Sequence, residues 1–390
     1  MNLRAKLFLD YYFGGFLHAV LRVPTILLGK LLRRNHDLSK CREIAILKLL
    51  GGGSLVIAYP ALLALRRLPG LQKLTLITTP AIRPFGDLLG IFDEIVVVRD
   101  DRGLLALAAD SVRAFRKFFR HDALIDLEIH SRLTTVFALL TAARNRIGFF
   151  TNISFWRRHL NTHLLFCNIT NGIYDFYDQL ATLFGTSPVD SGECEREFRS
   201  RLGEYGFEGD LFRLAIAPAC SGLSRERMLR REEWVEVLAQ RIARCGQAMV
   251  EVHLLGGPAD RVELEQMATL LEARFRGRAT MHNHAGKASL KESVRIIAAM
   301  DEVLCIDSAL LHFSRLLGRQ TVSFWGPTDP RTLIRPNPRG LDEIHYVKIP
   351  CSPCVHMSHQ PPCKGQNICM RLAVDPAAPV PRNQPWVLRG

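Results

Sequence analysis

Short apolar runs alternate with longer amphipathic segments along most of the chain. From Arg42 onward, β-branched runs at 43–49, 73–78, 94–98 and 123–127 are each followed by a segment with helical spacing. Such alternation is typical of parallel strands joined by crossover helices. It pauses over the polar stretch 187–210 and resumes with runs at 213–219, 248–257, 302–309 and 320–327. The pattern predicts two α/β halves joined by a linker, with a ligand cleft between them and functional residues directly after the strands.

Glycine and small polar residues follow these predicted strands. The first run leads into the glycines of 51–53, which permit close approach of a ligand, although an ordinary tight turn has the same composition. Three strand ends in the second half outline a nucleotide pocket, with Gly256, Gly257, Asp307, Ser308, Gly326, Pro327 and Thr328. No G-x-G-x-x-G follows the first strand and no P-loop is present, which disfavours a dinucleotide-binding protein or an NTPase.

Composition indicates a globular protein with an anionic partner. The 390 residues suggest two domains, and 48% hydrophobic residues are too many for broad disorder. The formal net charge of +13 fits nucleic acid, an anionic membrane or a phosphorylated small molecule. Residues 1–40 alone carry a net charge of +5 interleaved with aromatic and aliphatic residues. This segment is suited to lie in the plane of a bilayer, and packing on the protein's own core is the alternative.

The same opening segment argues against export and against a membrane span. Asp10, His18, Arg22 and Pro24 interrupt its apolar stretch, and no small-residue cleavage site follows. We therefore expect a cytoplasmic protein with mostly reduced thiols. Four of the ten cysteines have the spacing C-x2-C-x8-C-x5-C, at Cys351, Cys354, Cys363 and Cys369. They suit a structural zinc ion, and disulfides or reduced thiols are the alternatives.

Several motifs resemble glycosyltransferase family 9, the heptosyltransferase-like enzymes. The stretches 253–261 and 284–330 are similar to the family's second-domain pattern, which ends in D-S-G-P-x-H and F-G-P-T-D-P. The stretches 48–68 and 144–149 resemble the family's first strand, glycine turn and helix, and the close of its fourth unit. The resemblance covers about residues 42–371. It implies an α/β protein of the GT-B fold, with two Rossmann-like domains facing a central cleft, and inverting sugar transfer without a catalytic metal.

The resemblance also implies roles for single residues. Asp307 matches the aspartate placed by the donor sugar and diphosphate, and His312 the histidine of that motif, although Asp307 and Ser308 also suit a helix N-cap. Arg227 stands where the family has a lysine near the donor phosphates, where a cation neutralises the departing diphosphate; an ordinary surface arginine is the alternative. The expected donor-binding set is Gly52, Gly53, Ser54, Ser221, Arg227, Gly256, Gly257, Asp307, Ser308, His312, Gly326, Pro327 and Thr328.

The chain departs from the family at the catalytic base. Where the family has an aspartate after the glycine turn, this chain has Ser54, whose hydroxyl is too weak a base. Glu128 is the best substitute, because it stands at the end of the fourth predicted strand, on the same rim as the glycine turn, and puts a carboxylate where the family has a glutamine. We expect Glu128 to be the base, with Arg132 binding the acceptor or steadying Glu128; a helix-start carboxylate is the alternative. The expected catalytic residues are Glu128, Arg132, Arg227 and Asp307.

Together these observations predict an inverting, metal-independent glycosyltransferase on the inner face of the cytoplasmic membrane. It transfers a heptose-like sugar from a nucleotide-sugar donor to a lipopolysaccharide or lipid-linked acceptor, and nucleic acid is not expected as a partner. A catalytically impaired nucleotide-sugar-binding protein and a peripheral membrane scaffold are the alternatives. The expected parts are a membrane segment (1–40), an acceptor domain (41–190), a linker (191–210), a nucleotide-sugar domain (211–371) with a Cys-rich loop (350–370), and a proline-rich tail (372–390).

Overall fold

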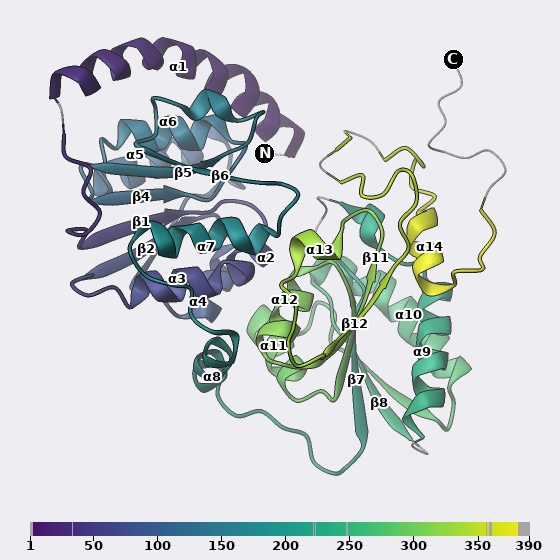
Figure 1. Cartoon of the computed structure of the whole chain (residues 1–390). Helices are drawn as coiled ribbons and strands as arrows, with labels where there is room; N and C mark the ends of the chain where they lie inside the picture. The colour runs from purple at the N-terminus through teal and green to yellow at the C-terminus, as the bar shows by residue number, and fades with distance from the viewer. Residues whose placement is uncertain are drawn as a thin grey trace, which may run out of the picture. The chain divides into compact units, whose positions relative to one another are not determined.

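The computed structural model divides the chain into two compact units, Met1–Cys194 and Glu195–Gly390. It describes residues 3–32, 34–220, 222, 224–246, 249–355, 357–358 and 361–380. Each unit is a parallel sheet with helices on both faces, so the strands are buried from both sides and their sequences are almost continuously apolar. The α/β fold class predicted from the alternating pattern is confirmed, and Figure 1 shows the elements of each unit.

The first unit is built on six parallel strands in the order β3-β2-β1-β4-β5-β6. They are β1 (Glu43–Leu47), β2 (Lys73–Thr78), β3 (Glu94–Val97), β4 (Ala123–Asp126), β5 (Asn145–Phe150) and β6 (His163–Phe166). The order reverses between β1 and β4, which pair directly, with Leu47 opposite Asp126. The loops after these two strands therefore start side by side, at the position where open α/β sheets bind ligands.

Helices on both faces complete the first unit. They are α2 (Gly52–Ile57), α3 (Tyr59–Arg66), α4 (Arg83–Leu89), α5 (Leu104–Lys117), α6 (Arg132–Leu140), α7 (Ile173–Leu183) and the short 3-10 helix η1 (Phe155–Arg157). On one face, Phe118 and Ala138 pack against Leu47 and Leu124 of the strands. In Figure 1, α5 and α6 lie on this side, and α3, α4 and α7 lie on the other.

The opening segment forms one long helix, α1 (Leu3–Leu32), with Pro24 inside it. It packs on α6 in Figure 1, and Asp10 makes hydrogen bonds to the start of α6. The stretch Leu7–Leu32 contains an 18-residue window, with a hydropathy of 1.4, that the rest of the protein does not bury, so by length and composition it could cross a membrane. Length and composition therefore do not exclude a span, contrary to what the sequence argument inferred from the interruptions.

The second unit repeats the architecture with the strand order β12-β11-β10-β7-β8-β9. Its strands are β7 (Phe212–Ala217), β8 (Val250–Leu254), β9 (Ala279–Asn283), β10 (Glu302–Ile306), β11 (Gln320–Trp325) and β12 (Asp342–Tyr346). Its helices are η2 (Arg225–Arg227), α9 (Arg231–Cys245), η3 (Pro258–Asp260), α10 (Arg261–Arg274), α11 (Leu290–Ala298), α12 (Ala309–Leu316), α13 (Pro330–Leu333) and α14 (Ile368–Val374). Here the order reverses between β7 and β10, which are paired.

The predicted linker and tail both contain helix. Residues 191–202 of the expected linker form α8 (Ser191–Leu202), because Phe198 is buried and stacks on Phe313 at a centroid distance of 5.7 Å. Helix α14 extends into the expected proline-rich tail as far as Val374. Residues 381–390 of that tail lie outside the described residues.

Candidate active site

Lys48 and Glu128 meet at the strand reversal of the first unit. Lys48 directly follows β1, and its Nζ lies 3.3 Å from Oε1 of Glu128; both side chains are largely buried. The same oxygen accepts hydrogen bonds from the backbone N–H groups of Leu49 and Leu50, at 2.7 and 2.9 Å. Burial acts to lower the pKa of Lys48, but Glu128, Tyr177 and Asp126 together outweigh it and the pKa is raised. These donors hold the Glu128 carboxylate directly beside the glycine turn.

Tyr177 joins this cluster from α7. Its side chain is fully buried and hydrogen-bonds Ser54, and burial raises its pKa above the usual value. Ser54, which stands where the family has an aspartate, is thus hydrogen-bonded to the buried Tyr177. Sequence reasoning missed both Lys48 and Tyr177. A lysine immediately after an apolar strand was a usable signal for Lys48, whereas nothing in the pattern of α7 distinguished Tyr177 from an ordinary core residue.

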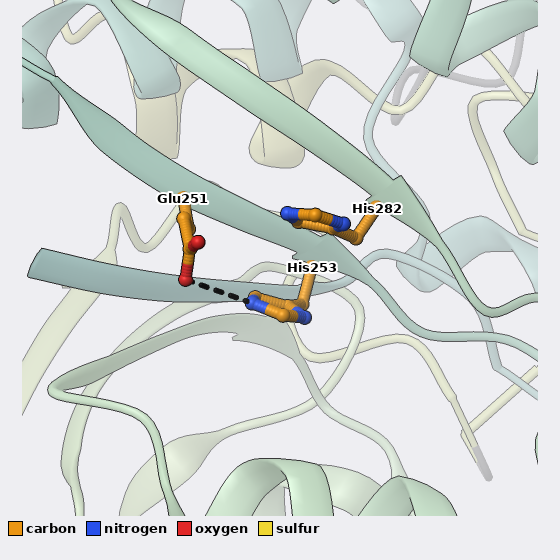
Figure 2. Close-up of side chains that lie close together, drawn as sticks. All are labelled: Glu251, His253 and His282. Carbon is orange, nitrogen blue, oxygen red and sulfur yellow. Dashed lines mark ion pairs between the residues drawn. The ribbon is translucent and has the colours of Figure 1, made fainter. Parts of the chain in front are cut away.

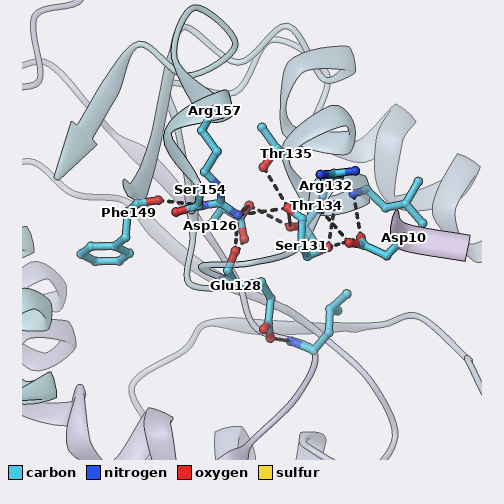
Figure 3. A network of polar contacts seen from close by, with 12 residues as sticks. Asp10, Asp126, Glu128, Ser131, Arg132, Thr134, Thr135, Phe149, Ser154 and Arg157 are labelled. Atoms are coloured by element: carbon cyan, nitrogen blue, oxygen red, sulfur yellow. Dashed lines mark hydrogen bonds and ion pairs between the residues drawn. The ribbon is translucent and has the colours of Figure 1, made fainter. Parts of the chain in front are cut away.

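A buried ion pair supports the loop that carries Glu128. Arg157 and Asp126 are fully buried, and Nη2 of Arg157 lies 3.1 Å from Oδ2 of Asp126 (Figure 3). Arg157 also donates to the carbonyl oxygens of Glu128, Ser131 and Phe149. Burial raises the pKa of Asp126 to about 6 against the opposing effect of Arg157. Charge-assisted hydrogen bonds from Arg157 therefore hold the loop between β4 and α6 in place.

Arg132 faces the opening helix rather than Glu128. Its Nη1 donates to the carbonyl of Tyr11 at 2.8 Å, and its guanidinium lies over the Tyr11 and Trp156 rings at 4.5 and 5.5 Å. Within the described part of the chain, no hydrogen bond or ion pair joins Arg132 to Glu128. The structure therefore brings Glu128 together with Lys48 and the glycine turn, and places Arg132 against α1.

The glycine turn is shaped by close packing. Gly51 has a φ of 72°, in the left-handed region that favours glycine, and a Cβ on Gly52 would approach the Phe85 ring to 2.4 Å. Gly52 and Gly53 open α2, which follows at once. The tight-turn explanation thus accounts for Gly51 and Gly52 without a ligand.

In the second unit, Arg227 and Asp307 meet across the strand reversal. Arg227 lies in η2 after β7, Asp307 directly follows β10, and Nη1 of Arg227 is 3.0 Å from Oδ2 of Asp307. Nε2 of His312 lies 3.9 Å from the other oxygen, Oδ1. Burial lowers the pKa of His312 to about 4 despite the neighbouring Asp307. Arg227 is thus no ordinary surface arginine, and three residues singled out in the sequence lie together. Ser221 lies outside the described residues.

Two hydroxyls beside this pair lack partners. Oγ of Ser308 and Oγ1 of Thr328 are buried, and neither atom makes a hydrogen bond within the described residues. Ser308 follows β10 and Thr328 follows β11, the adjacent strand, so both lie at the same edge of the sheet. A buried hydroxyl without a partner costs free energy. The absence of a bond from Ser308 also means that it does not cap α12 with its side chain.

Gly256 and Gly257 follow β8, the strand that pairs with β7 on the side away from β10. A Cβ on Gly256 would approach Leu264 to 2.6 Å, and the N–H of Gly257 donates to Asp260 at 2.9 Å. These contacts explain both positions by packing and by the turn into η3.

The Cys-rich loop packs on the end of β11. The backbone N–H groups of Cys354 and Val355 donate to the carbonyl of Pro327, each at 3.0 Å, and a Cβ on Gly326 would approach Sγ of Cys369 to 2.6 Å. All ten cysteines are free thiols. Burial, with added effects of the neighbouring thiols of the cluster, raises the pKa of Cys354 to about 11 and that of Cys369 to about 12. Four thiols near one another are a donor set that fits zinc, which would deprotonate them.

One protein-family profile matches the second half of the chain. Residues 182–364 match the family profile "Glycosyltransferase family 9 (heptosyltransferase)". No curated protein sequence matches the chain. The match starts later than the resemblance seen in the sequence, which included residues from 42 onward.

Solved structures extend the similarity to both units. Escherichia coli ADP-heptose lps heptosyltransferase II is 16% identical with a TM-score of 0.59, over 78% of this chain and 91% of that one. A family 9 glycosyl transferase from Veillonella parvula is also 16% identical with a TM-score of 0.59, over 80% and 87%. E. coli heptosyltransferase WaaC with ADP is 18% identical with a TM-score of 0.55, over 76% and 91%. Residues 182–364 therefore match the glycosyltransferase family 9 (heptosyltransferase) profile, and the chain as a whole has the GT-B fold of two Rossmann-like units.

Proposed function

We propose that this glycosyltransferase transfers a heptose-like sugar, with inversion, from a nucleotide-sugar donor to a lipid-linked or lipopolysaccharide acceptor. The observation that carries the proposal is the Arg227–Asp307 pair at the strand reversal of the family 9 domain, beside the unpartnered hydroxyls of Ser308 and Thr328. A guanidinium and two hydroxyls suit the oxygens of a diphosphate, and Arg227 would neutralise the charge that develops as the nucleoside diphosphate leaves.

Glu128 is the base in this proposal. The hydroxyl of the acceptor attacks the anomeric carbon of the donor, and its proton goes to Glu128. The contacts of the Glu128 carboxylate within the described residues are all made by Oε1, so Oε2 remains for the proton. Lys48 and the backbone donors fix the position of the carboxylate, as a general base that must reach the acceptor hydroxyl requires.

In this proposal, α1 attaches the protein to the membrane that holds the lipid of the acceptor. One stripe of α1, with Asp10, Gly14 and His18, contacts Ser131, Arg132 and the carbonyl of Trp156. The opposite stripe is apolar and at least half exposed, and it recurs every three or four residues at Phe8, Tyr12, Phe16, Val20, Val23, Leu27 and Leu31. A helix docked along one side and apolar along the other suits the membrane interface. A spanning orientation would break the Asp10 bonds and carry charge into hydrocarbon, so we place the protein peripherally on the inner face of the cytoplasmic membrane.

A zinc ion bound by Cys351, Cys354, Cys363 and Cys369 is a further part of the proposal. It would fix the loop that packs on Gly326 and Pro327, and it has no part in the chemical steps. Metal analysis of the purified protein and of a Cys354→Ser variant tests it.

Screening nucleotide sugars by thermal unfolding tests the proposed function. A ligand that binds the folded state at 100 times its Kd adds about 2.7 kcal/mol of stability. We expect one of ADP-heptose, UDP-sugars or GDP-sugars to raise the melting temperature, and Asp307→Asn together with Arg227→Gln to reduce that shift. If no nucleotide sugar shifts the transition of the wild-type protein, the proposal is wrong. A peripheral scaffold would give that result, although the family 9 domain does not favour it.

A further inference from the structure

A cluster of imidazoles lies on the outer strands of the second sheet, away from the strand reversal. His253 of β8 pairs directly with His282 of β9, and Glu251 lies two residues earlier on the same face as His253. Figure 2 shows the two rings and the carboxylate side by side. The His253 ring stacks on those of His282 and His284, at centroid distances of 4.8 and 5.3 Å. No step of the proposed reaction uses these residues.

The cluster contains nitrogen atoms without partners. Among the described residues, Nε2 of His253 and Nε2 of His282 are both buried and make no hydrogen bond. The His253 side chain is only 2% exposed. Leaving such a group unpaired costs free energy, and a ligand that binds both nitrogen atoms would remove that cost.

The hydrogen bond of His253 sets which nitrogen is available. Its Nδ1 lies 3.0 Å from Nε2 of His284. If Nδ1 carries the proton and donates to His284, then Nε2 of His253 carries a lone pair. A ring that uses one nitrogen as a donor to a second residue and keeps the other for a metal is the usual arrangement of a metal-binding histidine.

We propose that Glu251, His253 and His282 bind a divalent transition-metal ion of the zinc class. One ligand atom from each of the three residues lies within 4.8 Å of the others, and Nε2 of His253 is 3.9 Å from Oε2 of Glu251. Zinc binds imidazole nitrogen at about 2.0–2.1 Å, so the side chains move inward by small rotations when the ion enters. Glu251 and His282 are partly exposed, which gives the ion an entry path and leaves the fourth position to water.

The neighbouring charges narrow the choice of ion. Nε of Arg213 donates to Oε2 of Glu251 at 2.7 Å and places a positive charge beside the site. Binding must therefore come from coordination by imidazole rather than from net negative charge. Zn²⁺, Co²⁺, Ni²⁺ and Cu²⁺ accept imidazole, whereas Mg²⁺ and Ca²⁺ prefer oxygen. The bound ion would join β8 to β9, the outermost strand of its sheet, just before the chain turns at Gly256.

Cobalt titration of the full-length protein, freed of metal by a chelator, tests the site. Co²⁺ bound by thiolates gives strong sulfur-to-metal charge-transfer bands, whereas an imidazole and carboxylate site gives only weak visible absorption. The two spectra therefore separate this site from the cysteine cluster. We expect His282→Gln to abolish the imidazole-type signal and leave any thiolate bands unchanged. His284→Leu removes the hydrogen-bond partner of Nδ1 of His253 and should weaken Co²⁺ binding by about 10–100-fold.

The controls keep the outcome interpretable. His345→Gln makes the same change at a half-exposed histidine of the same unit, outside the cluster, and should leave the titration unchanged. Circular dichroism shows whether each variant folds; if His282→Gln does not, Glu251→Gln is used, and we expect it to weaken binding. The proposal is overturned if the wild-type protein shows no cobalt signal beyond that of thiolates, or if folded variants at 282 and 251 both bind Co²⁺ as the wild type does.

Discussion

Glu128 and Arg227 each lie where the strand order of their own sheet reverses, and each is held by a charged partner. Lys48 pairs with Glu128 in the first unit, and Asp307 pairs with Arg227 in the second. These partners fix the orientation of the two side chains before any substrate binds, which is the geometry that electrostatic catalysis needs.

Replacement of Glu128 by glutamine tests the base. The amide oxygen can still accept from Leu49 and Leu50, but the amide cannot take the acceptor's proton. We expect turnover to fall by about 10²–10⁴-fold, with nucleotide-sugar affinity little changed. Steady-state kinetics with the donor found by screening measures both quantities. Glu193→Gln, an exposed carboxylate of the same unit, is the control. Near-normal turnover of Glu128→Gln would rule out Glu128 as the base.

His312 gives the stability a defined dependence on pH. Its pKa is about 4 in the folded protein against 6.5 for an ordinary histidine, so the unfolded chain binds the proton more readily. The stability that the neutral ring contributes is therefore present above pH 6.5 and is lost as the pH falls towards 4. At 1.36 kcal/mol per pH unit the loss is about 3 kcal/mol.

Urea unfolding at pH 7 and pH 4.5 checks this dependence. His312→Asn should lose less stability than the wild type between the two pH values. Burial also lowers the pKa of His253, but His253 is present in both proteins, so the difference between them isolates the effect of His312. Equal pH dependence in the two proteins would contradict the assignment.

At the scale of elements, α1 is joined to α6 by Asp10. The Asp10 carboxylate accepts from Oγ of Ser131 at 2.6 Å and from the backbone N–H groups of Arg132 and Leu133 at 3.0 and 2.9 Å. Those N–H groups are among the donors that a helix start leaves without partners, and the helix dipole also favours a carboxylate there. The opening helix therefore stabilises the element that follows the Glu128 loop.

Removing this contact should loosen the first unit. We expect Asp10→Ala to cost about 1–3 kcal/mol of folding free energy and to speed hydrogen exchange of the first turn of α6. Asp37→Ala, which removes an exposed carboxylate bonded only locally to Ser39, is the matched control. Unchanged exchange in α6 would show that the Asp10 bonds do not hold the helix.

At the scale of the whole molecule, charge and exposed apolar surface occur together in the first forty residues. The net charge of +13 includes +5 from this segment. Neither property alone gives firm attachment. Salt screens the attraction between the charges and the membrane, and a half-exposed apolar stripe offers less apolar surface to the bilayer than a spanning helix does. In combination they favour an anionic membrane surface.

Vesicle sedimentation tests this attachment. We expect binding to phosphatidylglycerol vesicles, weaker binding to phosphatidylcholine vesicles, and partial release in high salt. Serine at Phe8, Phe16 and Leu27 together should lower the bound fraction by about tenfold or more, because it removes three apolar side chains from the interface. Serine at Val262 and Leu270, which are exposed apolar residues of α10, should have no effect. Equal binding by the two sets of variants would contradict a role for α1.

The alternation of apolar runs determined the two-part α/β fold, since strands buried on both faces require continuous apolar sequence. Residues directly after strands could likewise be selected from the sequence, as Asp307 shows, whereas the expectations for Glu128, Arg227 and His312 also needed the resemblance to glycosyltransferase family 9. The helix within 191–202 was missed because its buried apolar side is short, with Cys194, Phe198 and Leu202 in an otherwise polar stretch.

Only the tertiary structure decided which side chains far apart in the sequence contact one another. The sequence could place Arg132 near Glu128 by number, but the fold directs its side chain to α1, 121 residues away along the chain. The pairing of Lys48 with Glu128, of Asp126 with Arg157 and of His253 with His282 depends on strand order and register. Sequence periodicity reports which face of an element is buried, whereas the identity of the neighbour depends on how the elements are ordered in the sheet.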